Sequence, residues 1–135
     1  MSDRAGHRGY IASRPVRGLM QPQSVQNLVI RDYAARRGLA YRLSAAEYAM
    51  PGSYLVLESV LDELATLEGV IMYSLFMLPS RSERRHRVYR RVLDAGCTLH
   101  GAIEDMAIAD KDGVARAEDL ILADRFAARA LPAGL

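Results

Sequence analysis

The sequence predicts a single α/β domain, a three-layer sandwich in which a mainly parallel four-stranded sheet lies between helices on both faces. The first observation behind this fold class is the uncharged stretch GVIMYSLFML, residues 69–78, whose side chains suit a strand that is covered on both faces. The second is that amphipathic, helix-like segments lie on either side of it. The third is the alternation of strand-like and helix-like segments along the whole chain, which is typical of parallel sheets with right-handed crossovers.

The central stretch is apolar enough for a buried helix as well as for a strand. It is short, however, because Gly69 begins it and Pro79 follows it. Its Val, Ile, Tyr and Phe residues favour the pleated conformation. We therefore expect a central strand with helices above and below it.

The remaining elements are expected from periodicity and from residues that begin or end helices and strands. Pro15 ends the first strand, since proline disfavours the helical conformation at the residue before it. Ser53 is a good N-cap for the second helix. The expected elements are, in chain order, strand 10–13, helix 22–37, strand 39–48 near a sheet edge, a helix from Ser53, strand 69–78, a helix from Ser80 or Ser82 to Ala95, strand 97–108 and a helix from 114 to about 130.

Composition limits the class of protein. Residues 1–8 are polar and aperiodic and are expected to form a disordered tail before a single domain over residues 9–131. The formal charge of +2 gives no whole-protein argument for nucleic acid or acidic membranes. Cys97 is the sole cysteine, so no internal disulfide is expected. The chain has neither a signal-like N-terminus nor an apolar run of spanning length, which predicts a cytoplasmic protein that does not enter the membrane.

Polar side chains follow several of the expected strands. In parallel α/β sheets, ligands bind beyond the carboxyl ends of the strands, where such side chains converge. Arginine matches phosphate in a bidentate way, and carboxylates accept hydrogen bonds from sugar hydroxyls. We therefore expect a ligand site at this edge, within reach of the long loop 14–21. Its expected residues are Ser13, Arg14, Glu47, Tyr48, Arg81 and Glu104.

Several of these residues admit more than one interpretation. Ser13 is a candidate nucleophile, a ligand-binding hydroxyl or a plain loop residue, and no base lies beside it in the sequence. If the ligand is turned over, Glu47 or Glu104 is the candidate general base, and Arg14 or Arg81 the candidate anion stabiliser. No catalytic residue is assigned at this stage. No cofactor is expected, and no metal, because His100 and Glu104 together supply too few ligands.

The order of elements resembles the catalytic domain of serine recombinases, the resolvases and invertases. In that family the first strand is followed by Tyr-x-Arg-x-Ser, and the third leads into Leu-Asp-Arg-Leu-x-Arg. Here the corresponding runs read YIASR, residues 10–14, and LFMLPS, residues 75–80. Ala12 stands in place of the first Arg, Ser13 is one position early, and Phe76, Met77 and Ser80 replace the Asp and both Arg. The resemblance implies the fold, without the arginines that would stabilise a phosphoryl transition state.

Three longer runs resemble the small proteins called the sporadic carbohydrate cluster family. They are SRPVRGLMQPQSVQNLVIRDY at residues 13–33, LSAAEYAMPGSYLVLESVLDEL at 43–64 and GVIMYSLFMLP at 69–79. The resemblance implies a genomic context, the bacterial clusters that make surface polysaccharide. It implies no particular reaction.

Together these observations lead to one hypothesis and one alternative. The hypothesis is a cytoplasmic protein of bacterial surface carbohydrate biosynthesis that binds or modifies an activated, phosphate-bearing sugar, such as a nucleotide sugar, at the carboxyl edge of the sheet. The alternative is a non-catalytic resolvase-like assembly or nucleic-acid-binding module that uses the arginines of residues 81–91. Nucleic acid is disfavoured, because acidic residues share that helix. The apolar stripe of the last helix belongs either to the core or to a homodimer contact.

Overall fold

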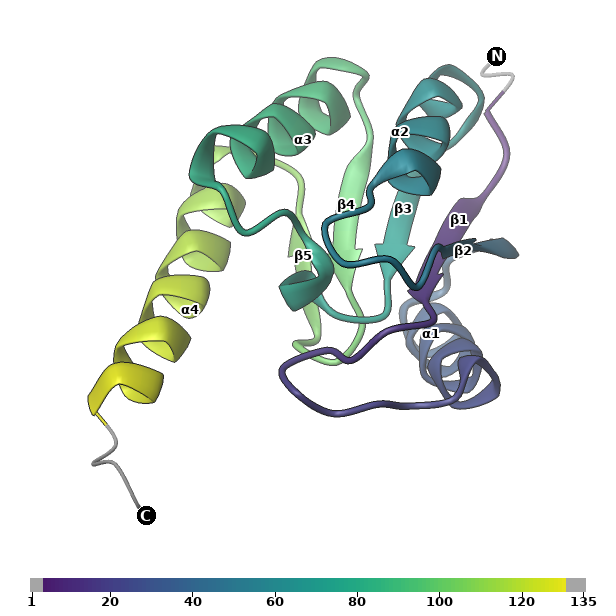
Figure 1. Ribbon diagram of the computed structural model, residues 1–135. Helices are drawn as coiled ribbons and strands as arrows, with labels where there is room; N and C mark the ends of the chain where they lie inside the picture. Colours follow the sequence, from purple (N-terminus) through teal and green to yellow (C-terminus); the bar gives the residue numbers. More distant parts are fainter. Residues whose placement is uncertain (1–3, 131–135) are drawn as a thin grey trace.

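The computed structural model describes residues 4–130 and shows a five-stranded sheet between helices (Figure 1). The strand order is β2-β1-β3-β4-β5, and all pairs are parallel except β4 with β5. In chain order the elements are β1 (His7–Ala12), α1 (Gln23–Arg37), β2 (Tyr41–Glu47), α2 (Leu55–Asp62), the 3₁₀ helix η1 (Leu64–Thr66), β3 (Gly69–Met72), the 3₁₀ helix η2 (Leu75–Met77), α3 (Ser82–Asp94), β4 (Thr98–Gly101), β5 (Met106–Ile108) and α4 (Lys111–Ala130).

The helices form two layers around the sheet, which confirms the predicted fold class. Figure 1 shows α2 and α3 on one face of the sheet and α1 behind it, with α4 alongside α3 and β5. The core lies between these layers and includes fully buried side chains of β1, β3 and α1, such as Tyr10, Ile71 and Ile30. None of the helices in the described part of the chain is long and apolar enough to cross a membrane.

The sheet has five strands where four were expected, because residues 97–108 do not form one continuous strand. The chain reverses direction after Gly101, and β5 pairs antiparallel with β4. Asp105, in the connecting turn, has a positive φ of 54°, and its N–H donates to the carbonyl of Ala102 over 3.2 Å. This local turn overrides the apolar alternation that predicted a single strand, and it places Glu104 at the tip of a hairpin.

The central strand prediction is correct for β3 and wrong for the residues that follow it. After Met72 the chain leaves the sheet and forms η2, although it stays buried. Side chains accept hydrogen bonds from the backbone N–H groups at this point. The hydroxyl of Ser74 accepts from the N–H of Phe76 over 3.2 Å, and the Glu104 carboxylate accepts from the N–H of Leu75 over 2.7 Å. An uncharged, apolar sequence is therefore common to the buried strand and to the buried turn beyond it, and does not distinguish the two.

Several element boundaries also differ from expectation; α4, for example, begins at Lys111 rather than at residue 114. β1 begins at His7, so His7 and Arg8 belong to the sheet rather than to the expected tail, and β1 ends at Ala12. α2 begins at Leu55, and Ser53 makes no N-cap hydrogen bond to it. Residues 1–3 of the expected tail and the expected domain end at 131 lie outside the described residues.

The strand order fixes where a ligand can bind. The chain passes from β1 to β2 on one side and later to β3 on the other, so strand order reverses at β1. The loop after β1 leads to α1 on one face, whereas the loop after β3 leads to α3 on the opposite face. Loops that diverge in this way leave a crevice at the carboxyl ends of the two strands.

Candidate functional site

A cavity of about 350 Å³ lies at this crevice, at the carboxyl edge of the sheet. Three segments far apart in the sequence form it: the loop after β1, the residues directly after β3, and the β4–β5 turn. In Figure 1 the loop after β1 sweeps below the carboxyl ends of the strands. The cavity is lined by Val16, Arg17, Leu19, Gln21, Tyr73, Ser74, Ile103 and Glu104. We refer to it as the rim cavity.

Glu104 supplies the carboxylate of the rim cavity. One of its oxygens accepts a hydrogen bond from the Ser74 hydroxyl, and the other accepts from the backbone N–H of Leu75, both over 2.7 Å. These two contacts fix the orientation of the side chain, which is only partly buried. A carboxylate oxygen has two lone pairs, so each oxygen can accept a further hydrogen bond from a ligand.

Arg17 supplies the positive charge of the rim cavity. It lies in a tight turn in which the backbone N–H and carbonyl groups of Val16 and Leu19 bond to each other over 2.8 and 3.0 Å. Its guanidinium donates to the carboxylate of Asp124 on α4 over 2.5 Å and lies 4.8 Å from the ring centre of Phe76. Its side chain is 55% exposed, so the group can be reached from solvent.

Both loops that carry these charges hold a non-glycine residue in the left-handed region. Within residues 4–130, Arg17 with φ 53° and Asp105 with φ 54° are the only such residues. An L-residue in this conformation costs of the order of 1 kcal/mol or more, and such residues cluster at functional sites. Here one lines the rim cavity and the other directly follows a lining residue.

Of the six residues expected to bind a ligand, the structure places Glu104 in the rim cavity. The Ser13 hydroxyl accepts a hydrogen bond from the Gln23 side chain at the start of α1. Tyr48 and Arg81 are exposed and do not line the cavity. The structure therefore does not bring the six residues together at one point.

Arg14 lies in the same loop as Arg17 and makes structural contacts instead. Its guanidinium donates to the carbonyl groups of Met50 and Ser53 over 3.1 and 2.9 Å, and it lies 5.0 Å from the ring centre of Tyr54. It thereby ties the turn after β2 to the loop after β1. These donors are engaged with backbone oxygens rather than turned toward the rim cavity.

Glu47 is buried and caps a helix. It is 1% exposed, and its carboxylate accepts from the Tyr10 hydroxyl over 2.7 Å and from the backbone N–H groups of Leu57 and Val56 over 2.9 and 3.1 Å. Burial alone would raise the pKa of this carboxyl, but the hydrogen bonds outweigh burial and hold the pKa below its usual value. Glu47 thus takes the capping role expected of Ser53, and its carboxylate faces the start of α2 rather than solvent.

Three polar residues of the rim cavity were missed, namely Arg17, Gln21 and Ser74. Arg17 and Gln21 lie in the loop whose length indicated a functional role. Ser74 was placed inside the central strand, because the strand was expected to continue to Leu78. Ser74, the only serine of an otherwise apolar run, was the available signal that the strand ends there.

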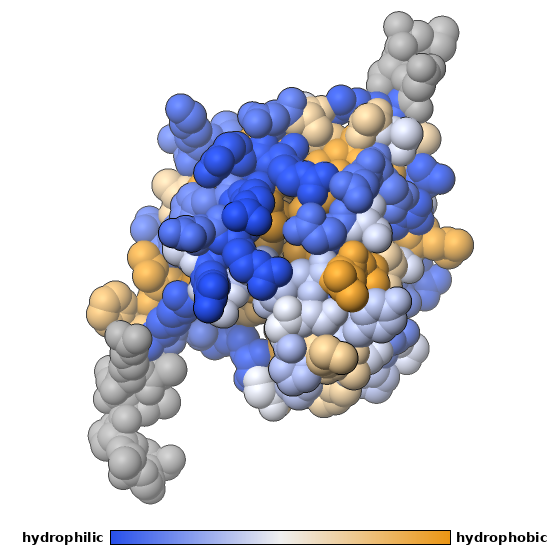
Figure 2. Space-filling view, turned by 45° about the horizontal axis from the view of Figure 1, so that its top comes forward, coloured by the Kyte–Doolittle hydropathy of each residue, from blue (hydrophilic) through white to orange (hydrophobic). Residues whose placement is uncertain are grey.

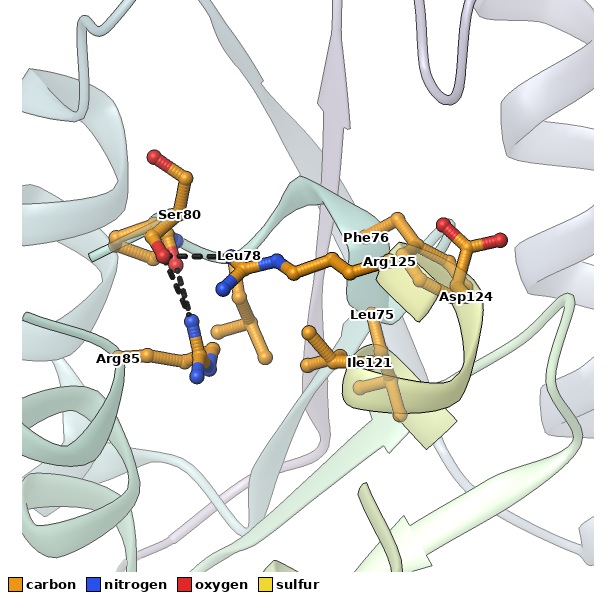
Figure 3. Close-up of a pocket in the computed structure, with 9 residues that line it drawn as sticks. Leu75, Phe76, Leu78, Ser80, Arg85, Ile121, Asp124 and Arg125 are labelled. Carbon is orange, nitrogen blue, oxygen red and sulfur yellow. Dashed lines mark hydrogen bonds between the residues drawn. The ribbon is translucent and has the colours of Figure 1, made fainter. Parts of the chain in front are cut away.

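A second, smaller cavity of about 80 Å³ lies between η2 and α4 (Figure 3). The guanidinium groups of Arg85 and Arg125 converge on the carbonyl of Ser80, over 3.0 and 2.6 Å. Arg85 is buried and also forms a bidentate pair with Glu118, over 2.7 and 2.6 Å. These contacts anchor α4 to the loop before α3, so we assign this cavity a structural role.

Metal-ligand side chains are scattered in the part of the chain that the structure describes. No three His, Cys, Asp or Glu residues between residues 4 and 130 come together as a metal site. Cys97 is buried, and its thiol faces the carbonyl groups of Leu64 and Leu67 over 3.4 and 3.3 Å. Burial raises the pKa of this thiol, which disfavours a reactive thiolate.

Comparison with known proteins supports the fold and gives no family. No family model matches the chain, and no curated protein sequence matches it. Among solved structures, the chain is similar to the N-terminal catalytic domain of TP901-1 integrase, with a TM-score of 0.57 and 14% identity over 90% of this chain and 97% of that one. The chain thus has the resolvase-like fold that its order of elements predicts. The resemblance to the sporadic carbohydrate cluster family rests on the sequence runs alone.

Proposed function

We propose that the chain binds a phosphate-bearing sugar, such as a sugar phosphate or nucleotide sugar, in the rim cavity. The observation that carries the proposal is the position of a partly satisfied carboxylate, Glu104, and a solvent-accessible guanidinium, Arg17, in one cavity at the point where the strand order reverses. The resemblance to the sporadic carbohydrate cluster family supplies the biological context, cytoplasmic steps of bacterial surface carbohydrate biosynthesis.

The side chains of the rim cavity suit the two halves of such a ligand. Glu104, Ser74 and Gln21 offer hydrogen-bond acceptors and donors for sugar hydroxyls. Arg17 offers a planar fork that matches a phosphate group. Leu19 and Ile103 add apolar surface, which the carbon faces of a sugar ring can cover.

DNA strand exchange does not fit the described residues. At the positions that carry arginine in the serine recombinase motif stand Ala12, buried at the end of β1, and Met77, buried in η2. The Ser13 hydroxyl has Gln23 as its hydrogen-bond partner rather than a base. The chain therefore keeps the fold and lacks the charges that phosphoryl transfer to a serine requires.

Ligand-induced stabilisation tests the proposal. UDP-glucose, GDP-mannose and glucose 1-phosphate are added to the full chain, and the thermal midpoint is recorded. A ligand at 100 times its dissociation constant stabilises the folded state by about 2.7 kcal/mol, which raises the midpoint by several degrees. Glu104→Gln removes the carboxylate charge and is expected to weaken binding about tenfold.

The matched control for that variant is Glu83→Gln, which makes the same change at an exposed position on α3. It is expected to bind like the wild type. If none of the three compounds shifts the midpoint, or if both glutamate variants respond alike, the rim cavity is not the ligand site.

A second candidate function follows from the surface of α3. Among the described residues, four exposed arginines of this region have no carboxylate partner: Arg81, Arg84, Arg87 and Arg90. Figure 2 shows hydrophilic side chains gathered over this part of the molecule. Retention on duplex DNA that falls steeply between 50 and 200 mM salt, on the scale typical of phosphate contacts, would favour nucleic-acid binding.

A further inference from the structure

The ion pair between Arg17 and Asp124 joins the rim cavity to α4. It spans 107 residues of sequence and connects a loop residue with a helix residue at 2.5 Å. Both side chains are in contact with solvent, with exposed fractions of 55% for Arg17 and 29% for Asp124. The pair is therefore accessible to an anion from solution.

Asp124 engages only part of the guanidinium. Arginine has five N–H donors, and the contact to Asp124 uses the terminal Nη2 group. Carboxylate and phosphate accept from the same fork of donors, so a phosphate group that enters the rim cavity competes with Asp124 for Arg17. A sugar phosphate carries close to two negative charges, and the diphosphate of a nucleotide sugar carries two in total, so either attracts the guanidinium more strongly than a single carboxylate does.

The position of Asp124 does not depend on Arg17. Its neighbour Arg125 donates to the Ser80 carbonyl over 2.6 Å, and about two turns earlier Glu118 pairs with buried Arg85. Because these contacts hold α4 in place, Asp124 stays where it is, in the lining of the smaller cavity beside Arg17, when the Arg17 side chain moves. The carboxylate then acts as a fixed negative charge beside the ligand site.

From this arrangement we infer that Asp124 is a selectivity residue for the rim cavity, which holds Arg17 when the site is empty and is displaced only by a phosphate-bearing ligand. The inference rests on the proposed function. A neutral sugar cannot compete for the guanidinium, so it gains nothing from Arg17. A phosphate or diphosphate gains the guanidinium at the cost of the ion pair, which is weak because both side chains are in contact with solvent.

The test measures binding of inorganic pyrophosphate, glucose 1-phosphate, UDP-glucose and glucose by calorimetry. Asp124→Asn removes the competing charge and is expected to tighten binding of the three phosphate-bearing compounds about two- to fivefold, with glucose unchanged. Arg17→Lys keeps the charge but loses the fork, and is expected to weaken the same three compounds. Asp119→Asn, an exposed position on the same helix, is the control and is expected to bind like the wild type.

The outcomes separate this inference from the proposed function. If the wild type binds phosphate-bearing compounds and Asp124→Asn does not bind them more tightly, the inference is wrong and the proposed function stands. The same holds if Asp124→Asn also binds glucose more tightly by the same factor. If neither the wild type nor Asp124→Asn binds any of the four compounds, both are wrong. If Asp119→Asn tightens binding of the phosphate-bearing compounds as much as Asp124→Asn does, the effect is one of general charge, and the inference is also wrong.

Discussion

Glu47 and Glu104 occupy similar places in the fold and differ in what surrounds them. Each lies at the carboxyl side of a strand, and each carboxylate accepts a hydrogen bond from at least one backbone N–H at the start of a helical segment, α2 for Glu47 and η2 for Glu104. Glu47 is buried and receives donors from Tyr10, Tyr48, Ser53, Val56 and Leu57. Glu104 is partly buried and receives two donors. A position at a strand end therefore makes a carboxylate a candidate for ligand binding. Its burial and the number of its hydrogen-bond donors then distinguish a helix cap from a ligand-binding group.

Removal of the Glu47 carboxylate gives the largest expected effect. Glu47→Ala leaves the Tyr10 hydroxyl and the N–H groups of α2 buried without an acceptor, so the free energy of unfolding is expected to fall by about 3 to 5 kcal/mol. Urea unfolding measures it, with Glu104→Gln as the comparison, expected to change stability by less than about 1 kcal/mol. Equal losses from the two variants would contradict the distinction between them.

The buried side chain of His100 is expected to make the stability of the fold depend on pH. His100 is buried, accepts or donates one hydrogen bond with Tyr33 over 2.7 Å, and has an Nε2 atom without a partner among the described residues. Burial, together with the nearby charges of His7 and Arg37, lowers the pKa of His100 from 6.5 to about 4. Between these two pH values the unfolded chain binds a proton at His100 that the folded chain does not. The contribution of neutral His100 to the free energy of unfolding is therefore fully present above pH 6.5 and is lost as the pH falls to 4.

The loss attributable to His100 is up to about 3 kcal/mol over this pH range. His100→Phe is expected to flatten the dependence of the unfolding free energy on pH between 6.5 and 4. Glu47, whose pKa is lowered, contributes its own loss of stability only at more acid pH, as its carboxyl becomes protonated. A wild-type profile without a slope between pH 6.5 and 4 would show that His100 titrates normally.

Glu104→Gln is expected to act on ligand binding and not on the fold. The amide keeps an acceptor for the N–H of Leu75 but removes the charge that attracts sugar hydroxyls, so affinity is expected to fall about tenfold, or about 1.4 kcal/mol. Isothermal titration with UDP-glucose measures the change. Unaltered affinity would place the ligand elsewhere.

Arg14 and Arg17 extend the same comparison to the loop after β1. Arg14 holds the turn after β2, so Arg14→Ala is expected to lower stability by about 1 kcal/mol and to leave affinity for glucose 1-phosphate unchanged. Arg17→Ala is expected to do the reverse, with a stability change below about 0.5 kcal/mol. Thermal unfolding with and without glucose 1-phosphate distinguishes them, and an Arg14→Ala variant that loses the ligand response would reverse the two assignments.

The sequence predicted the fold class well because periodicity and turn residues are local signals. The helix expected at residues 22–37 is α1, and the edge strand expected at residues 39–48 is β2. The hairpin of β4 and β5 was missed because the local turn at Asp105 interrupts the apolar alternation. The short η2 was missed because its first N–H bonds to a side chain far away in the sequence. Glu104 accepts the N–H of Leu75, which is 29 residues away.

The candidate site was only partly predictable for the same reason. Glu104 was expected at the sheet edge and lines the rim cavity, whereas Glu47 looked equivalent in sequence and proved to be a buried cap. Which of the two arginines in the loop after β1 reaches the cavity depends on the turn around Arg17 and Gly18, where both residues have positive φ. Strand-end position alone carries no information on that turn.

The most direct test of the central claim is a crystal structure of the chain soaked with UDP-glucose or glucose 1-phosphate. We predict ligand density in the rim cavity, with the sugar against Glu104 and Ser74 and the phosphate on Arg17. Density on the arginines of α3 with an empty rim cavity would contradict the account.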